Sequence, residues 1–136
     1  MINRQGAKEE PNQIVDALAK QVIGAALEVH NHLGPGYLEA VYGLALAHEM
    51  SERNISYQQQ YAISVPYKGI EVGQSKLDFL VADHLVVEIK AVDQLAPVHK
   101  AQVISYLKAC NLQLGLLINF GQKKLVDGLQ RIVLTH

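Results

Sequence analysis

Two carboxylates and a lysine lie close together in the most apolar part of the sequence. Asp78, Glu88 and Lys90 fall within residues 76–90, a stretch typical of two short sheet strands. Such side chains are rarely buried unless they are paired, because an isolated charge is costly in a medium of low dielectric. A bound cation is the most economical reason to bring them together, and Mg²⁺ prefers oxygen ligands of this kind. An alternative interpretation of these residues is a solvated face of the sheet with a cross-strand salt bridge.

The two strands that must position these residues are expected to meet at a tight Asp83-His84 turn. Side chains alternate along a strand with period 2, so Asp78 should point to one face of the sheet, while its neighbours Leu77 and Phe79 share the other. The flanking residues are apolar enough to predict the centre of a sheet that is covered on both sides.

Helices on either side of this hairpin supply further polar candidates. Glu39 is expected in the first turn of a helix, where a carboxylate interacts favourably with the helix dipole. Tyr42 lies three residues further on the same face. It either hydrogen-bonds a group that Glu39 touches or packs in the core with its hydroxyl satisfied. His99, Gln102 and Tyr106 form a polar stripe on a later helix. That stripe could equally be a polar helix edge with the tyrosine anchored in the core and the histidine capping or facing solvent.

The remaining elements follow from hydrophobic periodicity and turn residues. A helix over 37–53 is apolar almost all round at residues 38–47, apart from Glu39 and Gly43, which predicts that it is buried in the domain. Gly73 is expected to mark a bulge in its strand. This order predicts one α/β domain with a mixed sheet, built from an antiparallel meander and a helical crossover. The predicted elements are helices over 13–31, 37–53 and from 97, strands over 57–67, from 70 to the Asp83-His84 turn, 85–92 and 112–120, and a last segment over 129–134 that is either a strand or a frayed helix.

The composition of the chain excludes several classes of protein. A chain of 136 residues, 49% of them hydrophobic, suits one folded domain, here residues 12–136 after a flexible tail over 1–11. The net charge of −1 excludes a globally basic nucleic-acid coat protein, so attraction to phosphate would be local. The single cysteine, Cys110, excludes a disulfide framework and is expected to be a small core residue. Without a membrane-length apolar run or a signal-peptide core, a cytoplasmic protein with no membrane partner is the default expectation.

Two motifs in the chain resemble a known family. The stretch Gly36-Tyr37-Leu38-Glu39-Ala40-Val41-Tyr42 is similar to the motif that names the GxxExxY protein family. Asp78, followed by Glu88-Ile89-Lys90, resembles the D…ExK signature of the PD-(D/E)XK nuclease superfamily, in which that family is placed. The resemblance covers about residues 12–134. Leu77 stands where the superfamily name has Pro, but this position varies and its side chain should point into the core.

The resemblance implies a restriction-endonuclease-like core, in which a mixed β-sheet is flanked by helices. It also implies that Asp78 and Glu88 ligate Mg²⁺ or Mn²⁺, and that Glu39 is a further ligand, direct or through water. Lys90 would position or activate the attacking water and offset charge on the phosphate.

The helix after the hairpin would contribute the remaining site residues. By resemblance, Gln102 and Tyr106 would orient the substrate or the site carboxylates. Tyr42 is the candidate for a substrate-orienting residue on the helix of Glu39. With these, the candidate catalytic set is Glu39, Asp78, Glu88, Lys90 and Gln102.

These residues support three hypotheses. The first is a Mg²⁺-dependent nuclease that hydrolyses the phosphodiester bonds of nucleic acid, with DNA as the expected substrate, through a metal-activated water. The second is a catalytically silent nuclease-fold module for binding or assembly, in which an exposed strand or helix face could form a homodimer. The third is hydrolysis of a small phosphate ester or nucleotide. The chain has no helix-turn-helix signature, zinc finger or dense arginine stripe that would read a base sequence.

Overall fold

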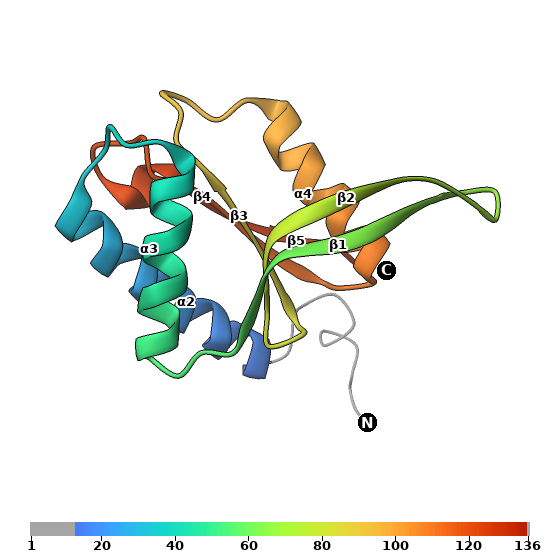
Figure 1. The fold of residues 1–136 in the computed structure, drawn as a ribbon, viewed down its shortest axis with the longest axis horizontal. Helices are drawn as coiled ribbons and strands as arrows, with labels where there is room; N and C mark the ends of the chain where they lie inside the picture. Colours follow the sequence, from blue (N-terminus) through green and yellow to red (C-terminus); the bar gives the residue numbers. More distant parts are fainter. Residues whose placement is uncertain (1–12, 136) are drawn as a thin grey trace.

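The helices and strands follow one another along the chain in the predicted order. The structure is a computed structural model that describes residues 13–135, so the predicted tail over 1–11 lies outside the described residues. The elements, drawn in Figure 1, are α2 (Gln13–Leu33), α3 (Glu39–Glu52), β1 (Tyr57–Tyr67), β2 (Ile70–Val81), β3 (Leu85–Lys90), α4 (Pro97–Cys110), β4 (Leu114–Asn119), the 3₁₀ turn η1 (Leu125–Gly128) and β5 (Leu129–Val133).

The strands form one mixed, five-stranded sheet in the order β1-β2-β3-β4-β5. β1, β2 and β3 are an antiparallel meander, β4 runs parallel to β3, and β5 closes the sheet antiparallel to β4. α4 makes the crossover between the two parallel strands. This arrangement confirms the predicted fold class, and the last segment is a strand rather than a frayed helix. The β2–β3 turn centres on Ala82 and Asp83, which have φ of 49° and 63°, one residue earlier than predicted.

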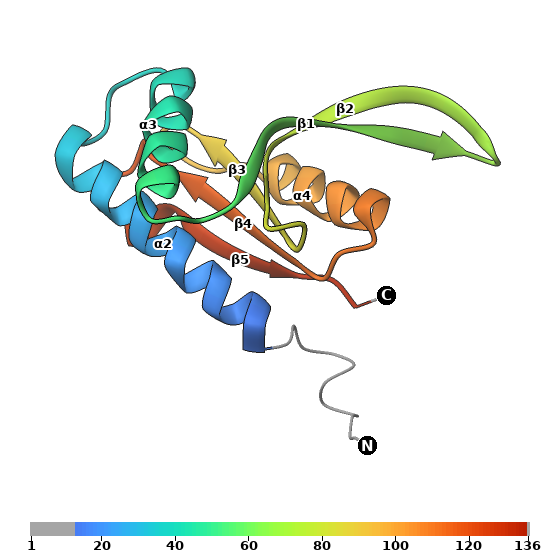
Figure 2. The same ribbon diagram turned by 60° about the horizontal axis from the view of Figure 1, so that its bottom comes forward.

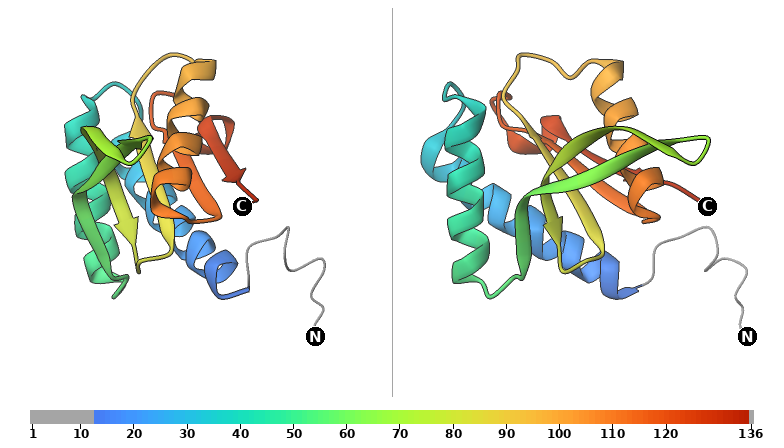
Figure 3. Two further views of the ribbon diagram at one scale, coloured as in Figure 1. Left: turned by 90° about the vertical axis from the view of Figure 1, so that its right-hand side faces the viewer. Right: turned by 45° about the vertical axis from the view of Figure 1, so that its right-hand side comes forward.

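Helices cover both faces of the sheet (Figure 3, left). α2 and α3 pack on one face and bury the larger core, which includes Val22, Leu46, Val87 and Phe120. α4 packs on the other face over a smaller core that includes Val86 and Leu107, with Cys110 partly buried against it. The division of the apolar side chains between two faces is what a sheet covered on both sides requires. None of the helices described in residues 13–135 is long and apolar enough to cross a membrane.

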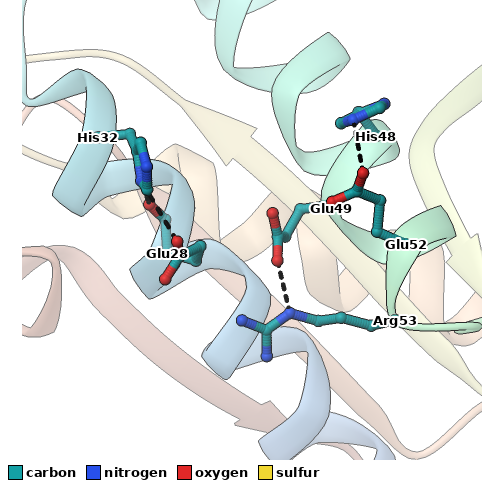
Figure 4. A network of polar contacts seen from close by, with 6 residues as sticks. All are labelled: Glu28, His32, His48, Glu49, Glu52 and Arg53. Carbon is teal, nitrogen blue, oxygen red and sulfur yellow. Dashed lines mark hydrogen bonds and ion pairs between the residues drawn. The ribbon is translucent and has the colours of Figure 1, made fainter.

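Ion pairs between residues four apart lie along α2 and α3 (Figure 4). The two pairs that involve histidine are exposed and stabilise their helices only slightly, whereas the Glu49–Arg53 pair is less exposed and lies beside Gly24 of α2. The pairs are Glu28 with His32, His48 with Glu52, and Glu49 with Arg53.

α3 differs from the predicted helix that is buried on all sides. Tyr42, Leu46 and Met50 are fully buried, but Leu44 is 68% exposed and Leu38, just before the helix, is 78% exposed. The reason is that only one side of α3 packs against α2 and the sheet. Its other side faces a cavity at the base of the β1–β2 hairpin.

The β1–β2 hairpin extends beyond the body of the protein as a long arm that passes over α4 (Figures 1 and 2). We call residues 61–77 the arm. Its tip turns at Lys68 and Gly69, which both have positive φ. The pairing register shifts between Val65 and Pro66, which leaves Val72 as an extra residue in β2. The bulge predicted at Gly73 therefore lies one residue earlier.

Where the arm leaves the sheet, the regular alternation of side chains between the two faces is interrupted. The prediction that Leu77 and Phe79 share a face is therefore wrong. Leu77 packs in the α4 core, whereas Phe79 packs in the α2–α3 core. The β1–β2 pairing skips Gln60 and Asp78, and Gln60 has a left-handed φ of 54°. Strict alternation holds only along a continuous ladder, so this break allows neighbours on opposite sides of Asp78 to reach different cores.

Candidate functional site

The predicted carboxylates lie where β2 and β3 separate. The backbone ladder between these strands begins at Phe79 and Val87 and does not extend to Asp78 and Glu88. Side chains take over there: the Asp78 N–H donates to Glu88 Oε2 at 2.7 Å, and the Ile89 N–H donates to Asp78 Oδ2 at 2.8 Å. One oxygen of each carboxylate is thereby fixed. The other oxygen accepts no hydrogen bond from residues 13–135.

The surroundings of the pair disfavour the charged form of Glu88. Glu88 is only 3% exposed, and burial, followed by repulsion from Asp78, raises its pKa to about 8. The hydrogen bond from the Asp78 backbone and the charge of Lys90 oppose this rise without cancelling it. Desolvation disfavours the charged form of a carboxyl group, and a second carboxylate nearby adds to the penalty. A cation bound beside the pair would stabilise the charged carboxylates and so oppose the rise in pKa.

Glu39 and Lys90 approach the pair from two elements. Burial and the charge of Asp78 raise the pKa of Glu39, while Lys90 and His99 lower it. Glu39 opens α3, and Lys90 ends β3, so both are at the end of the sheet where the arm departs. His99 uses its Nδ1 atom to accept the Ala96 N–H at 2.9 Å and so caps α4. The capping alternative for His99 is therefore correct, and the same ring also interacts electrostatically with Glu39.

α4 brings Gln102 and Tyr106 to the carboxylates. Burial, then the charges of Glu88 and Asp78, raise the pKa of Tyr106, and hydrogen bonds with the side chains of Gln102 and Ser75 oppose that rise. The tyrosine hydroxyl is thus influenced from α4 and β2 as well as by the pair. Ser75 was not anticipated from the sequence. Its position two residues before Leu77, which faces α4, is the signal that could have identified it.

Tyr42 is not joined to the pair by any contact among the described residues. Its ring is fully buried and stacks on Phe120, with 4.7 Å between ring centroids. Its hydroxyl donates to the Gly34 carbonyl and accepts the Tyr37 N–H at 3.2 Å. The structure therefore shows the second interpretation of Tyr42, a core residue with a satisfied hydroxyl that fixes the loop before α3.

Asn119 positions the segment that follows Lys90, and sequence reasoning missed it. It is fully buried, its Oδ1 accepts the N–H groups of Val92 and Gly121 at 3.0 Å each, and its Nδ2 donates to the Val92 carbonyl at 2.9 Å. A side chain at Gly121 would place Cβ 2.2 Å from the Val92 oxygen, so only glycine fits. The only sequence signal was a polar residue at the end of an apolar run.

A cavity of about 500 Å³ opens beside Asp78, between α3 and the base of the arm. Its lining combines the carboxylates of Glu39 and Asp78 with apolar side chains and two amides. The lining residues are Glu39, Ala40, Gly43, Leu44, Gln59, Gln60, Asp78, Phe79 and Ile89.

The donor set suits a hard divalent cation. Mg²⁺ takes one or two carboxylates and keeps several waters, which matches the pair formed by Asp78 and Glu88. Within residues 13–135, no three histidine, cysteine, aspartate or glutamate side chains are gathered closely enough to hold a metal. Glu39 therefore does not complete a three-ligand cluster with Asp78 and Glu88 within these residues.

The mixed sheet, its helical layers and the paired carboxylates define an α/β protein with a restriction-endonuclease-like fold. A sequence model described as the PD-(D/E)XK nuclease superfamily matches residues 16–132. Because this match spans most of the chain, the protein belongs to the PD-(D/E)XK nuclease superfamily. Neither the curated proteins nor the solved structures that were compared gave a match. PD-(D/E)XK nucleases generally use divalent metal ions, and the fold implies a nucleic-acid partner.

Proposed function

We propose that this protein is a Mg²⁺- or Mn²⁺-dependent nuclease that hydrolyses phosphodiester bonds, with DNA as its substrate, and that it is a GxxExxY protein within the superfamily. The observation that carries the proposal is the carboxylate pair. Asp78 and Glu88 are held together against their mutual repulsion, beside Lys90, at an opening of the sheet.

Each side chain of the site has a separate role in the proposed reaction. A divalent cation, when bound, supplies an acidified water and neutralises charge on the phosphate. Lys90 can donate from Nζ to a phosphate oxygen, which offsets charge as the bond breaks. Glu39 can accept a proton or a hydrogen bond from water at the cavity wall. Gln102 and Tyr106 on α4 orient the substrate or the site carboxylates, and the charges of Glu88 and Asp78 act on Tyr106.

Isosteric and truncated variants test this function. In Asp78→Asn, one negative charge is lost, so calorimetry should show weaker Mg²⁺ and Mn²⁺ binding, and cleavage of DNA should fall by at least roughly 100-fold. Lys90→Met should retain metal binding and lose cleavage to a similar degree. Asp83→Asn, in the exposed β2–β3 turn, is the matched control. Wild-type cleavage by folded Asp78→Asn would contradict the proposal.

The arm favours a second candidate function, a nuclease-fold module for binding or assembly. Tyr67, Ile70 and Val72 at its tip are each at least 60% exposed, and exposed apolar clusters mark interaction surfaces. A homodimer through the arm is the simplest assembly. Sedimentation should then show dimers that Ile70→Lys disrupts, while Mg²⁺ binding stays intact. A monomer at micromolar concentration, with cleavage activity present, would remove this candidate.

A further inference from the structure

Gly43 is an unexpected residue for the middle of α3. Glycine destabilises a helix interior relative to alanine, because it loses more backbone freedom on folding. Packing does not explain it, since a Cβ at Gly43 would meet only Gln59 Nε2, at an ordinary 3.8 Å. Gly24 in α2 differs, because a Cβ there would lie 3.2 Å from Arg53. What the glycine does provide is space, since Gly43 lines the cavity beside Asp78.

Gln60 is a second locally unfavourable residue on the same cavity. Its φ of 54° is left-handed, a conformation that residues with side chains rarely adopt inside a strand. It lies opposite Asp78, at the point where the β1–β2 pairing is skipped. Strained backbone of this kind persists where the surrounding structure enforces it and clusters at binding sites. Two unfavourable residues on two elements therefore converge on one cavity.

The chemistry of the cavity suits a flat, polar-edged ligand. Ligand pockets are usually apolar clefts of roughly 300–1,000 Å³ with a few polar groups that fix orientation. Leu44 supplies exposed apolar surface, the buried Phe79 and Ile89 lie behind the cavity wall, and the Gln59 and Gln60 amides each offer a donor beside an acceptor. The edge of a nucleobase presents the same alternation of donors and acceptors.

We propose that this cavity binds the base of an unpaired nucleotide whose phosphate lies at the Asp78–Glu88 pair, with Gln59 and Gln60 hydrogen-bonded to the edge of the base. The location of the phosphate rests on the proposed nuclease function. A base inside a duplex has its pairing edge occupied, so the cavity selects a single-stranded or flipped-out nucleotide.

The test compares ligands with and without a base. Deoxynucleoside 5′-monophosphates and 2-deoxyribose 5-phosphate are titrated in Mg²⁺, and binding is followed by calorimetry or NMR. The wild-type protein should bind at least one monophosphate about tenfold more tightly than the sugar phosphate. Gly43→Met, which fills the cavity with a flexible helix-forming side chain, should bring this ratio close to one. Gln60→Gly, which removes the amide and relieves the backbone, should do the same.

The control is Asn54→Gly, which relieves a left-handed residue (φ 59°) that does not line the cavity and should keep the wild-type ratio. If Gly43→Met fails to fold, Gln59→Ala takes its place. Equal binding of the two ligand types by the wild-type protein, or an unchanged ratio in the cavity variants, would overturn the inference. Base-dependent binding without DNA cleavage would refute the nuclease proposal alone, and cleavage without base-dependent binding would refute only this inference.

Discussion

Glu88 is a side chain whose charged form is disfavoured by folding. Its burial and the nearby Asp78 raise its pKa to about 8, and the pKa of Glu39 shifts in the same direction. Yet Glu88 Oε2 accepts a backbone hydrogen bond that holds β2 to β3. The Glu88 carboxylate therefore stabilises the fold through the hydrogen bond at Oε2. In its charged form it also destabilises the fold, unless a bound cation neutralises it.

Stability without metal should therefore fall as pH rises. A folded-state pKa above the unfolded value of about 4.5 means that folding favours the protonated form. The stabilisation is fully present below about pH 4.5 and is lost as pH rises through about 8. Melting temperatures in chelator across this range should decrease with pH, and Mg²⁺ should restore stability most at the alkaline end.

Glu88→Gln should flatten that dependence, because the neutral amide keeps an acceptor for the Asp78 N–H without titrating. Glu71→Gln, on the exposed arm, provides the control and should follow the wild-type curve. Parallel pH curves for the wild type and Glu88→Gln would show that Glu88 is not the group responsible.

The loop after β3 depends on one buried amide at the end of β4. Asn119 accepts the N–H groups of Val92 and Gly121 and donates to the Val92 carbonyl, so it fixes the backbone that leaves Lys90. A loop held this tightly gives Lys90 a defined position relative to Glu88, which is what a preorganised site requires.

Asn119→Leu should lower the free energy of unfolding by at least about 2 kcal/mol, because two buried N–H groups lose their acceptor at about 1–3 kcal/mol each. Urea denaturation measures this loss. Gln130→Leu, on the exposed side of β5, should change stability by no more than about 0.5 kcal/mol. If both variants unfold at the same urea concentration, Asn119 does not hold the loop as described.

Element order, sheet topology and the approach of Asp78 to Glu88 were predictable, because periodicity and turn residues place the two carboxylates on paired strands. The face of the sheet to which Leu77 points was not predictable. Alternation of side chains assumes an unbroken ladder, and nothing about a glutamine in the sequence indicates the left-handed backbone of Gln60. The exposed side of α3 was also missed, because an apolar helix looks the same whether it faces a core or a cavity. Asn119 was missed because a buried amide at a strand end resembles an ordinary turn residue.

Charge is distributed unevenly over the whole molecule. α4 carries Lys100 and Lys108 and no acidic residue, and Lys108 lines a hollow between α4 and the arm. The opposite layer is acidic, since α2 and α3 carry Asp16, Glu28, Glu39, Glu49 and Glu52 against Lys20. A polyanion is therefore expected to approach from the α4 side, where the local charge is positive although the net charge is −1.

The variant Lys100→Glu/Lys108→Glu should weaken DNA binding at every sequence and reduce the slope of log affinity against log salt by about 1 per lysine. Fluorescence anisotropy at several salt concentrations, with Asp78→Asn as background to prevent cleavage, measures both effects. Lys20→Glu on α2 is the control and should leave the slope unchanged. A slope that falls equally in the two variants would place the nucleic acid elsewhere.

The order β1-β2-β3-β4-β5 means that every strand joins the sheet beside the strand made just before it. Contacts between near neighbours in the chain favour fast folding. Asp78 and Glu88 are only ten positions apart and lie on the two strands of one hairpin. Gln102 and Tyr106 follow on α4, so the candidate site residues from Asp78 to Tyr106 come from three consecutive elements.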